Sequence, residues 1–540
     1  MTQGKIIGIS GPTVSVDLED LTLFERVSVG CSGLQGEVVR LMPGGAVVQV
    51  YEETKGLCAG EPVVRQGAPL TVRLAPGLLG EIFDGLQRPL RRLGQEFGPF
   101  LRPGDTLPVV PCEQRRIFVP TRQPGEEVRA GEFVGYVLEG EFKHYLAAPC
   151  AGRLGQMATG EICPEDAVAT LADGTSILAA AQWPIRKPRP YRKKLFPRQA
   201  LFTGQRAIDF LFPLARGGTA ILPGGFGTGK TILEQAIAKF AEVDIVVYVG
   251  CGERGNEMAE MLEEFAGLAD PWTGSRLLAR TVLVANTSNM PVAAREASIY
   301  TAVSMAEYYR DMGYHVLLLA DSISRWAEAL REISSALEEM PGEEGYPTYL
   351  ASRLSSFLAR AGAVETVNGQ VGSLSMILSV SPPGGDFTEP TTQACLRGAG
   401  TFLMLDTDLA HRRHFPAINW TNSYSLYAAD MVECCAREIA PQWGELKKRC
   451  QALLKKEQRL REVAEIVGAE GLQDGDRLLM HAAQRIRHRF LCQNSFTGDA
   501  FSTPAQTVEL ITKLIAQYDA GLERLARGES LAEILAGMQG

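Results

Sequence analysis

Long hydrophobic runs are absent from this chain of 540 residues. No segment reaches the roughly 18 uninterrupted apolar residues that a membrane-spanning helix requires. The first residues, Met1-Thr2-Gln3-Gly4-Lys5, lead directly into a strand pattern and lack the apolar core of a signal peptide. We therefore expect any membrane role of the protein to be peripheral.

Histidine is scarce, and the cysteines form no recognisable pattern. Among the six histidines, His411 and His414 lie three apart but lack acidic or thiol companions, so we interpret them as structural and not as metal ligands. The 11 cysteines include no C-x-x-C pair, and their odd number argues against a disulfide framework. A reducing cytosol is expected. Cys434 and Cys435 are either redox-active or, as we favour, simply buried.

Positive charge is not in excess. The chain has 54 lysines and arginines against 63 acidic residues, a net charge of -9, which argues against a main surface that binds nucleic acid. Six of the cations fall between Trp183 and Lys194, in a proline-rich segment that suits neither a helix nor a central strand. We interpret this segment as an extended, solvated linker in preference to a phosphate site.

The length exceeds what one hydrophobic core supports, so several domains are expected. Short alternating runs between glycine and proline turns are typical of β-barrels and other β modules. Apolar strands that alternate with helical stretches predict a mostly parallel sheet covered by helices. The domains expected in chain order are a β-barrel over 1–72, a connector over 73–93, a β-rich insertion over 94–182, the linker over 183–194, a P-loop α/β domain over 195–427 and an α-helical bundle over 428–540.

One segment fits the phosphate-binding pattern G-x-x-x-x-G-K-[ST], between a strand at 219–222 and an amphipathic helix pattern. Its residues are Gly224, Gly225, Phe226, Gly227, Thr228, Gly229, Lys230 and Thr231. Glycines let backbone N–H groups wrap around phosphate, and the helix N-terminus adds further donors. Lys230 is expected to pair with the β- and γ-phosphates and the Thr231 hydroxyl to bind Mg²⁺, which predicts ATP or ADP as ligand. A tight glycine turn before a helix is the structural alternative.

Two further strand ends carry the groups that nucleotide hydrolysis needs. Asp321 follows the apolar run 315–320 and is expected in the Mg²⁺ shell, with capping of the next helix as the alternative. Glu253 lies between glycines at the end of another strand and is the candidate for orienting or deprotonating the attacking water. Arg254 either stabilises the γ-phosphate, positions Glu253 or forms a plain salt bridge. Phe415 either stacks on a base or is buried core.

A further series of motifs surrounds these residues. Together they closely resemble the catalytic A subunit of V-type and archaeal A-type rotary ATPases, densely from about residue 182 to 427 and more weakly at both ends. The motifs, by residue, are Thr203 to Arg206, Gly225 to Thr231, Gly250 to Met258, Asn286 to Pro291, Ala320 to Ser322, Ser381 to Asp386, His414 to Trp420, and at the ends Gly77 to Pro89 and Leu491 to Phe496.

The resemblance implies a RecA-like nucleotide-binding domain in an A3B3 ring, whose three catalytic sites lie at the subunit interfaces. A neighbouring B subunit would supply an arginine finger, and central stalk, peripheral stalk and a membrane sector that moves H⁺ or Na⁺ would complete a complex on the cytoplasmic face of a membrane. The β-rich insertion would be the bulge that distinguishes this subunit from F-type relatives. The implied roles are phosphate and Mg²⁺ binding by Lys230 and Thr231, water activation by Glu253, γ-phosphate contact by Arg254, and adenine contact by Phe415, Gln493 and Phe496.

The sequence departs from the family in two places. Thr228 stands where cysteine or serine is usual, and we expect no consequence because this loop position offers chiefly its backbone N–H. The chain stops at Gly540, whereas the members it resembles continue with further helix, so rotor coupling and not ATP chemistry is the property expected to change. The competing hypotheses are a non-catalytic nucleotide-binding subunit of such a ring, and a secretion or nucleic-acid motor of the same superfamily.

Overall fold

The computed structural model of the chain describes residues 3–538 except 99, 101 and 103. The expectations for Met1, Thr2 and Gly540 therefore lie outside the described residues. The chain forms two compact units. Unit 1 comprises Met1–Phe196, Val243–Val380 and Asp386–Gly398, and unit 2 comprises Pro197–Glu242, Ser381–Gly385 and Ala399–Gly540.

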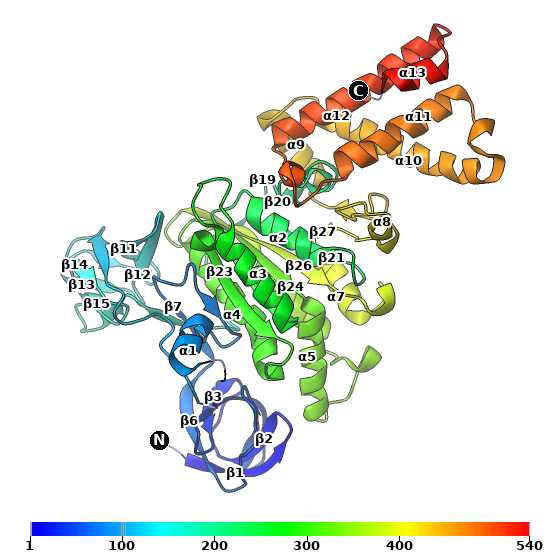
Figure 1. Ribbon diagram of the computed structural model, residues 1–540. Helices are drawn as coiled ribbons and strands as arrows, with labels where there is room; N and C mark the ends of the chain where they lie inside the picture. Colours follow the sequence, from blue (N-terminus) through cyan, green and yellow to red (C-terminus); the bar gives the residue numbers. More distant parts are fainter. Residues whose placement is uncertain (1–2, 99, 101, 103, 539–540) are drawn as a thin grey trace. The chain divides into compact units, whose positions relative to one another are not determined.

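Unit 1 begins with a closed six-stranded barrel, drawn in blue in Figure 1. The strand order is β1-β2-β5-β4-β3-β6, and antiparallel pairing of β1 with β6 closes the barrel. Alternate residues point inward and form an apolar core, as a sequence period of two predicts, so the expected N-terminal β-barrel is confirmed. The strands are β1 (Gln3–Ser10), β2 (Thr13–Asp17), β3 (Glu25–Val29), β4 (Leu34–Met42), β5 (Gly45–Val50) and β6 (Pro62–Pro69).

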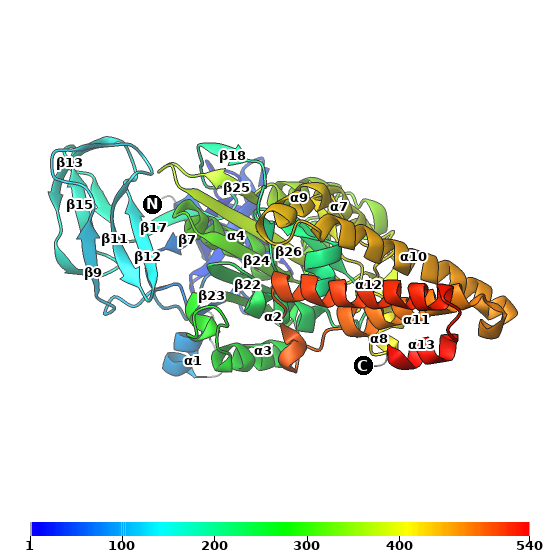
Figure 2. The same cartoon turned by 90° about the horizontal axis from the view of Figure 1, so that it is seen from above.

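A second β module follows β7 (Thr71–Leu74), β8 (Ile82–Phe83) and α1 (Leu90–Phe97). Its two four-stranded antiparallel sheets, β10-β13-β15-β16 and β12-β11-β9-β14, are seen in Figure 2. Side chains from both sheets share one apolar core, which includes Phe118, Val137, Leu154 and Ile177. The strands are β9 (Arg116–Pro120), β10 (Glu127–Val128), β11 (Phe133–Glu139), β12 (Phe142–Ala147), β13 (Gly152–Met157), β14 (Gly160–Ile162), β15 (Ala167–Leu171) and β16 (Ser176–Leu178).

The rest of unit 1 is built on a parallel sheet with the order β26-β24-β22-β23-β8. Its strands are almost fully buried, which explains their continuous apolar sequences. The long strands are β22 (Ile245–Glu253), β23 (Thr281–Thr287), β24 (His315–Asp321) and β26 (Val371–Val380), with β25 (Gly362–Glu365) antiparallel beside β26. The helices are α3 (Gly255–Gly267), α4 (Val292–Asp311), α5 (Ile323–Ala336), α6 (Leu350–Leu358) and α7 (Pro390–Gly398).

Helix α4 is unusual because every residue from Ala293 to Arg310 is buried. It packs against β22 and β24 and lies beside α5. A helix that is buried all round must have protein on both sides, and its charged residues need partners. Glu296, Glu307 and Arg310 are such residues, and each forms ion pairs.

The basic segment between β17 (Ala181–Pro184) and β18 (Lys193–Leu195) supplies many of these partners. Arg186 donates to the carboxylates of Glu37, on barrel strand β4, and Glu296, on α4, at 3.0 and 2.8 Å. Ile185 is 1% exposed. The segment is extended, and Lys187, Lys193 and Lys194 are exposed, as expected of a solvated linker. Arg186 and Arg189 depart from that expectation, because they hydrogen-bond to acids that the fold buries.

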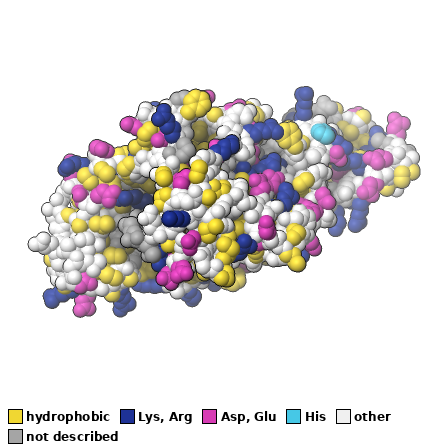
Figure 3. Space-filling view, turned by 90° about the horizontal axis from the view of Figure 1, so that it is seen from below, with side chains coloured by type: hydrophobic (Ala, Val, Ile, Leu, Met, Phe, Trp, Pro, Cys, Tyr) yellow, Lys and Arg dark blue, Asp and Glu magenta, His cyan; other side chains and the backbone are white. Residues whose placement is uncertain are grey.

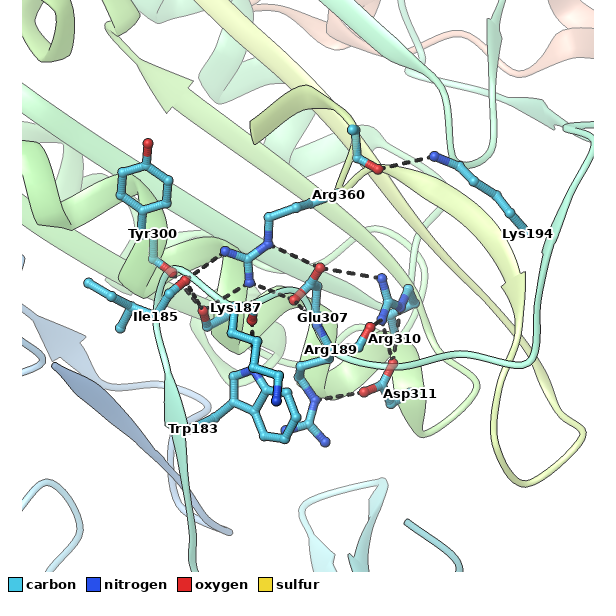
Figure 4. Close-up of polar contacts among 12 residues, drawn as sticks. Trp183, Ile185, Lys187, Arg189, Lys194, Tyr300, Glu307, Arg310, Asp311 and Arg360 are labelled. Carbon is cyan, nitrogen blue, oxygen red and sulfur yellow. Dashed lines mark hydrogen bonds and ion pairs between the residues drawn. The ribbon is translucent and has the colours of Figure 1, made fainter. Parts of the chain in front are cut away.

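Figure 4 shows the second part of this network, along the C-terminal half of α4. Arg189 Nε donates to Asp311 at 2.6 Å, and Arg360 pairs with Glu307 at 2.6 Å. Arg360 also donates to the Ile185 carbonyl at 2.7 Å, which fixes the backbone of the segment. Buried pairs of this kind are costly to break singly, so they hold the segment against α4.

Unit 2 contains the strand that precedes the phosphate-binding motif. This strand, β21 (Thr219–Pro223), pairs in parallel with β27 (Thr401–Phe402), and β28 (Tyr424–Ser425) pairs antiparallel with β27. Helix α2 (Lys230–Phe240) follows the motif, and α8 (Thr407–His411) follows β27. The short strands β19 (Ala200–Leu201) and β20 (Leu214–Ala215) form a separate pair.

A helical bundle forms the rest of unit 2, as the sequence predicted. Thr503 and Gln506 form a capping box at the start of its long helix α12, with Pro504 in the first turn. Leu478, Leu531 and Ile534 belong to one of its apolar clusters. The helices are α9 (Ala428–Glu438), α10 (Trp443–Val467), α11 (Asp474–Arg485), the π-helical Ile486–Leu491, α12 (Pro504–Ala526) and α13 (Leu531–Gly537).

None of the helices in the described part of the chain combines the length and the apolar composition needed to cross a bilayer. On the face shown in Figure 3, cationic and anionic side chains are interspersed. This face therefore differs from the clustered lysines and arginines with which proteins hold nucleic acids.

Candidate functional site

The phosphate-binding motif forms the turn between β21 and α2 in unit 2. Gly227 and Gly229 have φ angles of 77° and 81°, a left-handed conformation that favours glycine. Gly224 has no room for a side chain, since a Cβ there would lie 2.7 Å from Leu405 Cβ and 2.8 Å from Thr228 Oγ1. Among the described residues, no side chain caps the start of α2. The first turn of an α-helix directs its backbone N–H groups out of the helix end, which is the feature that an anion site uses.

Lys230 holds its ammonium group against the same loop. Its Nζ donates to the carbonyl oxygens of Gly224 at 2.5 Å and Gly225 at 3.1 Å. These bonds fold the side chain back along the turn, beside the glycine backbone. A phosphate bound by the loop would therefore meet a fixed positive charge.

The side chains of Thr228 and Phe226 differ in their exposure to solvent. Thr228 is 2% exposed, and its Oγ1 donates to the Gly225 carbonyl at 2.9 Å, so its side chain supports the turn from inside. Phe226 is 89% exposed. Thr231 is partly exposed in the first turn of α2. The Thr228 side chain is therefore engaged within the turn, and the role of its backbone N–H stays a prediction.

Phe415 approaches the loop from a distant part of the chain. A Cβ built on Gly229 would lie 3.4 Å from Cδ1 and Cε1 of the Phe415 ring. The ring is 38% exposed. Of the two interpretations of Phe415, buried core is wrong, and the accessible ring face is available for stacking on a base.

Gln493 is tied to Phe415 through the backbone. Its N–H donates to the Phe415 carbonyl at 2.7 Å. Its side chain is 1% exposed, and both polar ends are engaged: Oε1 accepts from the Arg206 N–H, and Nε2 donates to the Gly204 carbonyl. Gln493 therefore holds the Phe415 segment in place, whereas Phe496, at 81% exposed, presents its ring to the surface.

Arg206 holds the chain at the end of the π-helical segment Ile486–Leu491. No role was predicted for this arginine from the sequence. Its guanidinium donates to the carbonyls of Phe490 and Cys492, each at 2.8 Å. It also pairs with both oxygens of Asp499, at 2.5 and 2.8 Å. Together with Gln493, this arginine fixes the segment that leads to the exposed Phe496.

Asp209 fixes the backbone just before Arg206. Its carboxylate accepts hydrogen bonds from the N–H and hydroxyl of Thr203 and from the N–H of Gly204. Burial raises the pKa of Asp209 to about 7, although these three bonds oppose the rise. The only sequence signal was the run Thr203 to Arg206 in the family motif, because nothing in the local pattern showed that residue 209 would be buried.

His414 makes the Phe415 region sensitive to pH. The ring is 7% exposed and packs against Trp420. Burial chiefly, and then the charges of His488 and Arg487, lower the pKa of His414 from 6.5 to about 4. Between pH 6.5 and about pH 4, His414 binds a proton in the unfolded chain but stays neutral in the folded chain. The contribution of His414 to the free energy of unfolding is therefore expected to fall by about 2 kcal/mol from pH 7 to pH 5, whereas the raised pKa of Asp209 acts in the opposite direction.

The His414 contribution can be separated by substitution. His414→Asn, which cannot titrate, is expected to reduce this loss in urea unfolding followed by tryptophan fluorescence at pH 7 and pH 5. His411→Asn, at an exposed histidine nearby, serves as the control and should retain the full loss. An unchanged pH dependence in His414→Asn would show that another group titrates.

In unit 1, Asp321 lies at the carboxyl end of β24 and is 3% exposed. Its Oδ1 accepts a hydrogen bond from Ser379 Oγ, on the neighbouring strand β26, at 2.5 Å. The N-cap of the following helix α5 is Ser322, without a side-chain cap bond from the described residues. The carboxylate of Asp321 is therefore oriented from the sheet, through Ser379 on the neighbouring strand.

Glu253 is the last residue of β22 and is partly exposed. Three residues earlier, Gly250 is in register with Asp321 on β24, so both carboxylates lie at the same edge of the sheet. Gly252 has a φ of 73°, and a Cβ there would lie 2.6 Å from Arg325 Cβ. The glycine before Glu253 is therefore required for close packing as well as for backbone conformation.

Arg254 precedes α3 as its N-cap, and 64% of its side chain is exposed. Its Nη1 lies 3.3 Å from Oε1 of Glu257. The plain salt bridge is thus present, and an ion pair this exposed contributes little to stability. The pairing leaves the proposed γ-phosphate role of Arg254 open.

Thr231 and Asp321 have the chemistry of Mg²⁺ ligands. Within the described residues, no group of three or more His, Cys, Asp or Glu side chains is arranged to hold a metal. Mg²⁺ prefers hard oxygen ligands and usually takes few of them from protein and the remainder from phosphate and water. The Thr231 hydroxyl and the Asp321 carboxylate each offer an oxygen of this kind. Thr231 belongs to unit 2, and Asp321 to unit 1.

The adjacent cysteines are separate from these groups. Cys434 and Cys435 are buried and free, which confirms the interpretation as packing. Burial raises the pKa of Cys435 to about 12, so its thiol stays protonated and unreactive.

Protein-family models match three stretches of the chain. The beta-barrel domain of the ATP synthase alpha/beta family matches residues 6–67, and the nucleotide-binding domain of that family matches residues 204–425. The C-terminal domain of V and A type ATP synthase matches residues 433–535. The matched ranges contain the barrel, the P-loop with both strand-end carboxylates, and the helical bundle.

Curated relatives match over almost the whole chain. The second A subunit of the A-type ATP synthase of Methanospirillum hungatei JF-1 is 48% identical over 541 residues, with 99% of this chain and 93% of the relative covered. The A subunit of the A-type ATP synthase of Methanoculleus marisnigri is 49% identical, with 97% and 90% covered. The V-type ATP synthase alpha chain of Anaeromyxobacter dehalogenans is 48% identical, with 98% and 93% covered.

Among solved structures, the assembled ATPase EscN from the enteropathogenic E. coli type III secretion system covers 95% of this chain and 100% of its own. The TM-score is 0.69 and the identity 22%. This similarity shows a shared fold.

Proposed function

The chain belongs to the family of A-type and V-type ATP synthase A subunits, and from this premise we propose that it is the catalytic subunit of a rotary ATPase. It hydrolyses or synthesises ATP, with Mg²⁺, in exchange for movement of H⁺ or Na⁺ across a membrane. The observation that carries the proposal is the glycine loop with Lys230 fixed against it. Such a loop is suited to a triphosphate, and the relatives extend the match over both ends of the chain.

The P-loop residues, Gly224 to Thr231, bind the β- and γ-phosphates. Their backbone N–H groups bind the oxygens, and Lys230 exchanges its bonds to the loop carbonyls for bonds to phosphate. The Thr231 hydroxyl and Asp321 would hold Mg²⁺, which neutralises negative charge on the phosphates when bound. Ser379 orients Asp321 for this task.

Glu253 positions the water that attacks the γ-phosphorus and takes its proton as the bond forms. A partly exposed carboxylate at the end of a buried strand has the access and the rigidity that this role needs. Arg254 acts beside it on the γ-phosphate, after exchange of its exposed partner Glu257. The adenine ring lies between Phe415 and Phe496, while Gln493 sets the distance between their segments.

The site is completed by another subunit. The chain is expected to alternate with B subunits in an A3B3 ring, and an arginine from B stabilises the charge of the transferring phosphate. Central and peripheral stalk subunits and an ion-translocating membrane sector complete the complex, with this protein on the cytoplasmic face. A non-catalytic subunit would not need Lys230, Glu253 and Asp321 together, and the likeness to a secretion ATPase concerns the fold alone.

Loss of the Lys230 ammonium is expected to weaken ATP binding. A hydrogen bond to a charged group is worth about 1.5–3 kcal/mol, so Lys230→Ala should raise the Kd for Mg-ATP by roughly 10- to 100-fold. The Kd can be measured by calorimetry on the full chain. Lys239→Ala, in the last turn of the same helix, is the control and should bind like the wild type. Unchanged binding in Lys230→Ala would contradict the proposed phosphate site.

A further inference from the structure

Two loops that carry exposed cysteines meet at one end of the N-terminal barrel. Residues 30–33 connect β3 to β4, and residues 51–61 connect β5 to β6. The Gly30 N–H donates to the Pro62 carbonyl at 2.8 Å, and a Cβ built on Gly30 would lie only 2.4 Å from Leu57 Cδ2. The residues directly before Cys31 and Cys58 are therefore in contact.

One carboxylate joins the two cysteines. Glu61 Oε2 accepts from the Cys31 N–H, and Oε1 accepts from the Cys58 N–H, both at 2.8 Å. These bonds, the Cys31 N–H first, hold the pKa of Glu61 below its ordinary value. Both peptide groups are thus anchored to opposite oxygens of a single ionised side chain.

Both thiols are free and exposed, whereas five other cysteines are buried. Cys58 Sγ donates to the nearby Gly56 carbonyl at 3.8 Å, which is a weak bond that a small rotation breaks. A disulfide requires Cα atoms about 4.4–6.8 Å apart. Two loops whose neighbouring residues touch, and whose cysteine N–H groups share one carboxylate, are suited to this separation.

We propose that Cys31 and Cys58 form a reversible redox site, at which a small-molecule disulfide such as oxidised glutathione produces an intramolecular disulfide. One thiolate attacks a sulfur of the oxidant, so the oxidant's S–S bond breaks and one glutathione thiolate leaves. The second cysteine thiolate then attacks the protein sulfur of the mixed disulfide and displaces the other glutathione. The two protein thiols together lose two electrons and two protons. The oxidised glutathione takes these up and is released as two molecules of reduced glutathione.

The product would link the β3–β4 turn to the β5–β6 connection. A covalent bond between the two loops would restrict local opening at this end of the barrel. An exposed disulfide in a reducing compartment is readily reversed by thiols, which makes the site responsive to the ratio of oxidised to reduced glutathione.

The test uses the full wild-type chain, reduced and then incubated with glutathione buffers of increasing oxidised fraction. After alkylation of free thiols, intact mass and peptide mapping identify the products. The expected main product has lost two hydrogens and contains a peptide that joins Cys31 to Cys58, and added reduced glutathione removes it. Separate glutathione adducts on the two cysteines, links to other cysteines, or no reaction would each overturn the proposal.

Single substitutions sharpen the result. In Cys31→Ser and Cys58→Ser the remaining cysteine has no partner, so a glutathione adduct should accumulate there instead of the linked peptide. Cys112→Ser, which removes an exposed cysteine outside both loops, is the control and should form the link like the wild type. A link that forms normally in Cys31→Ser or Cys58→Ser would assign it to other residues.

Discussion

Replacement of Glu253 by glutamine is expected to lower the kcat of ATP hydrolysis by the assembled ring about 10²- to 10⁴-fold. Glutamine has the same shape but cannot accept the proton of the attacking water. Because Glu253 is only partly buried at the end of β22, the substitution should leave the fold intact. The Kd for Mg-ATP should change little, since phosphate binding rests on the P-loop.

The comparison requires a matched change nearby. Glu260→Gln removes an exposed carboxylate on the adjacent helix α3 and should retain wild-type turnover. Steady-state hydrolysis and ATP binding are measured for both rings. If Glu253→Gln turned over like Glu260→Gln, Glu253 would not be the base, and the non-catalytic hypothesis would gain support.

The second large effect is expected from the partner in the ring. The isolated chain should hydrolyse ATP very slowly, and addition of its B subunit should raise turnover per site by about 10³- to 10⁵-fold, the contribution usual for an arginine finger. The physical reason is that negative charge develops on the γ-phosphate during the reaction. The arginine of B stabilises this charge in addition to Lys230 of the P-loop.

This effect can be measured by titrating the chain with B and following phosphate release. A B variant whose finger arginine is replaced by alanine should assemble with the chain but fail to stimulate it. Fast turnover by the chain alone would contradict a site shared between subunits. Turnover stimulated by RNA or DNA would instead support a nucleic-acid motor.

Much of the fold and part of the site were predictable because the signals are local. The alternate apolar residues of two strands, Val14 and Val16 in the first and Ala46, Val48 and Val50 in the second, form the inward face of the barrel. The P-loop depends on glycines at set spacing between a strand and a helix, and Gly227 and Gly229 do adopt the conformation that requires them. Asp321 and Glu253 were expected at strand ends, and the strand register does place both at one edge of the sheet, while their chemical roles stay predictions.

The remainder depends on contacts between residues far apart in sequence. Arg186 looked like part of a solvated basic run, but its partners Glu37 and Glu296 lie 149 and 110 residues away. The clamp of Arg206 on Asp499 spans 293 residues. No local period or spacing carries such pairings, because they arise only when the fold buries the charges and forces them to pair.

The central claim, that this chain is the catalytic subunit of a rotary ATPase, is tested most directly in membrane vesicles that carry the assembled complex. ATP-driven ion uptake and ATP hydrolysis are measured together in wild-type and Glu253→Gln complexes of equal subunit content. The account predicts that both activities are lost together in the variant while the wild type shows ion uptake that depends on ATP. Ion uptake at the wild-type rate in Glu253→Gln, or hydrolysis in the wild type that never drives ion uptake, would contradict it.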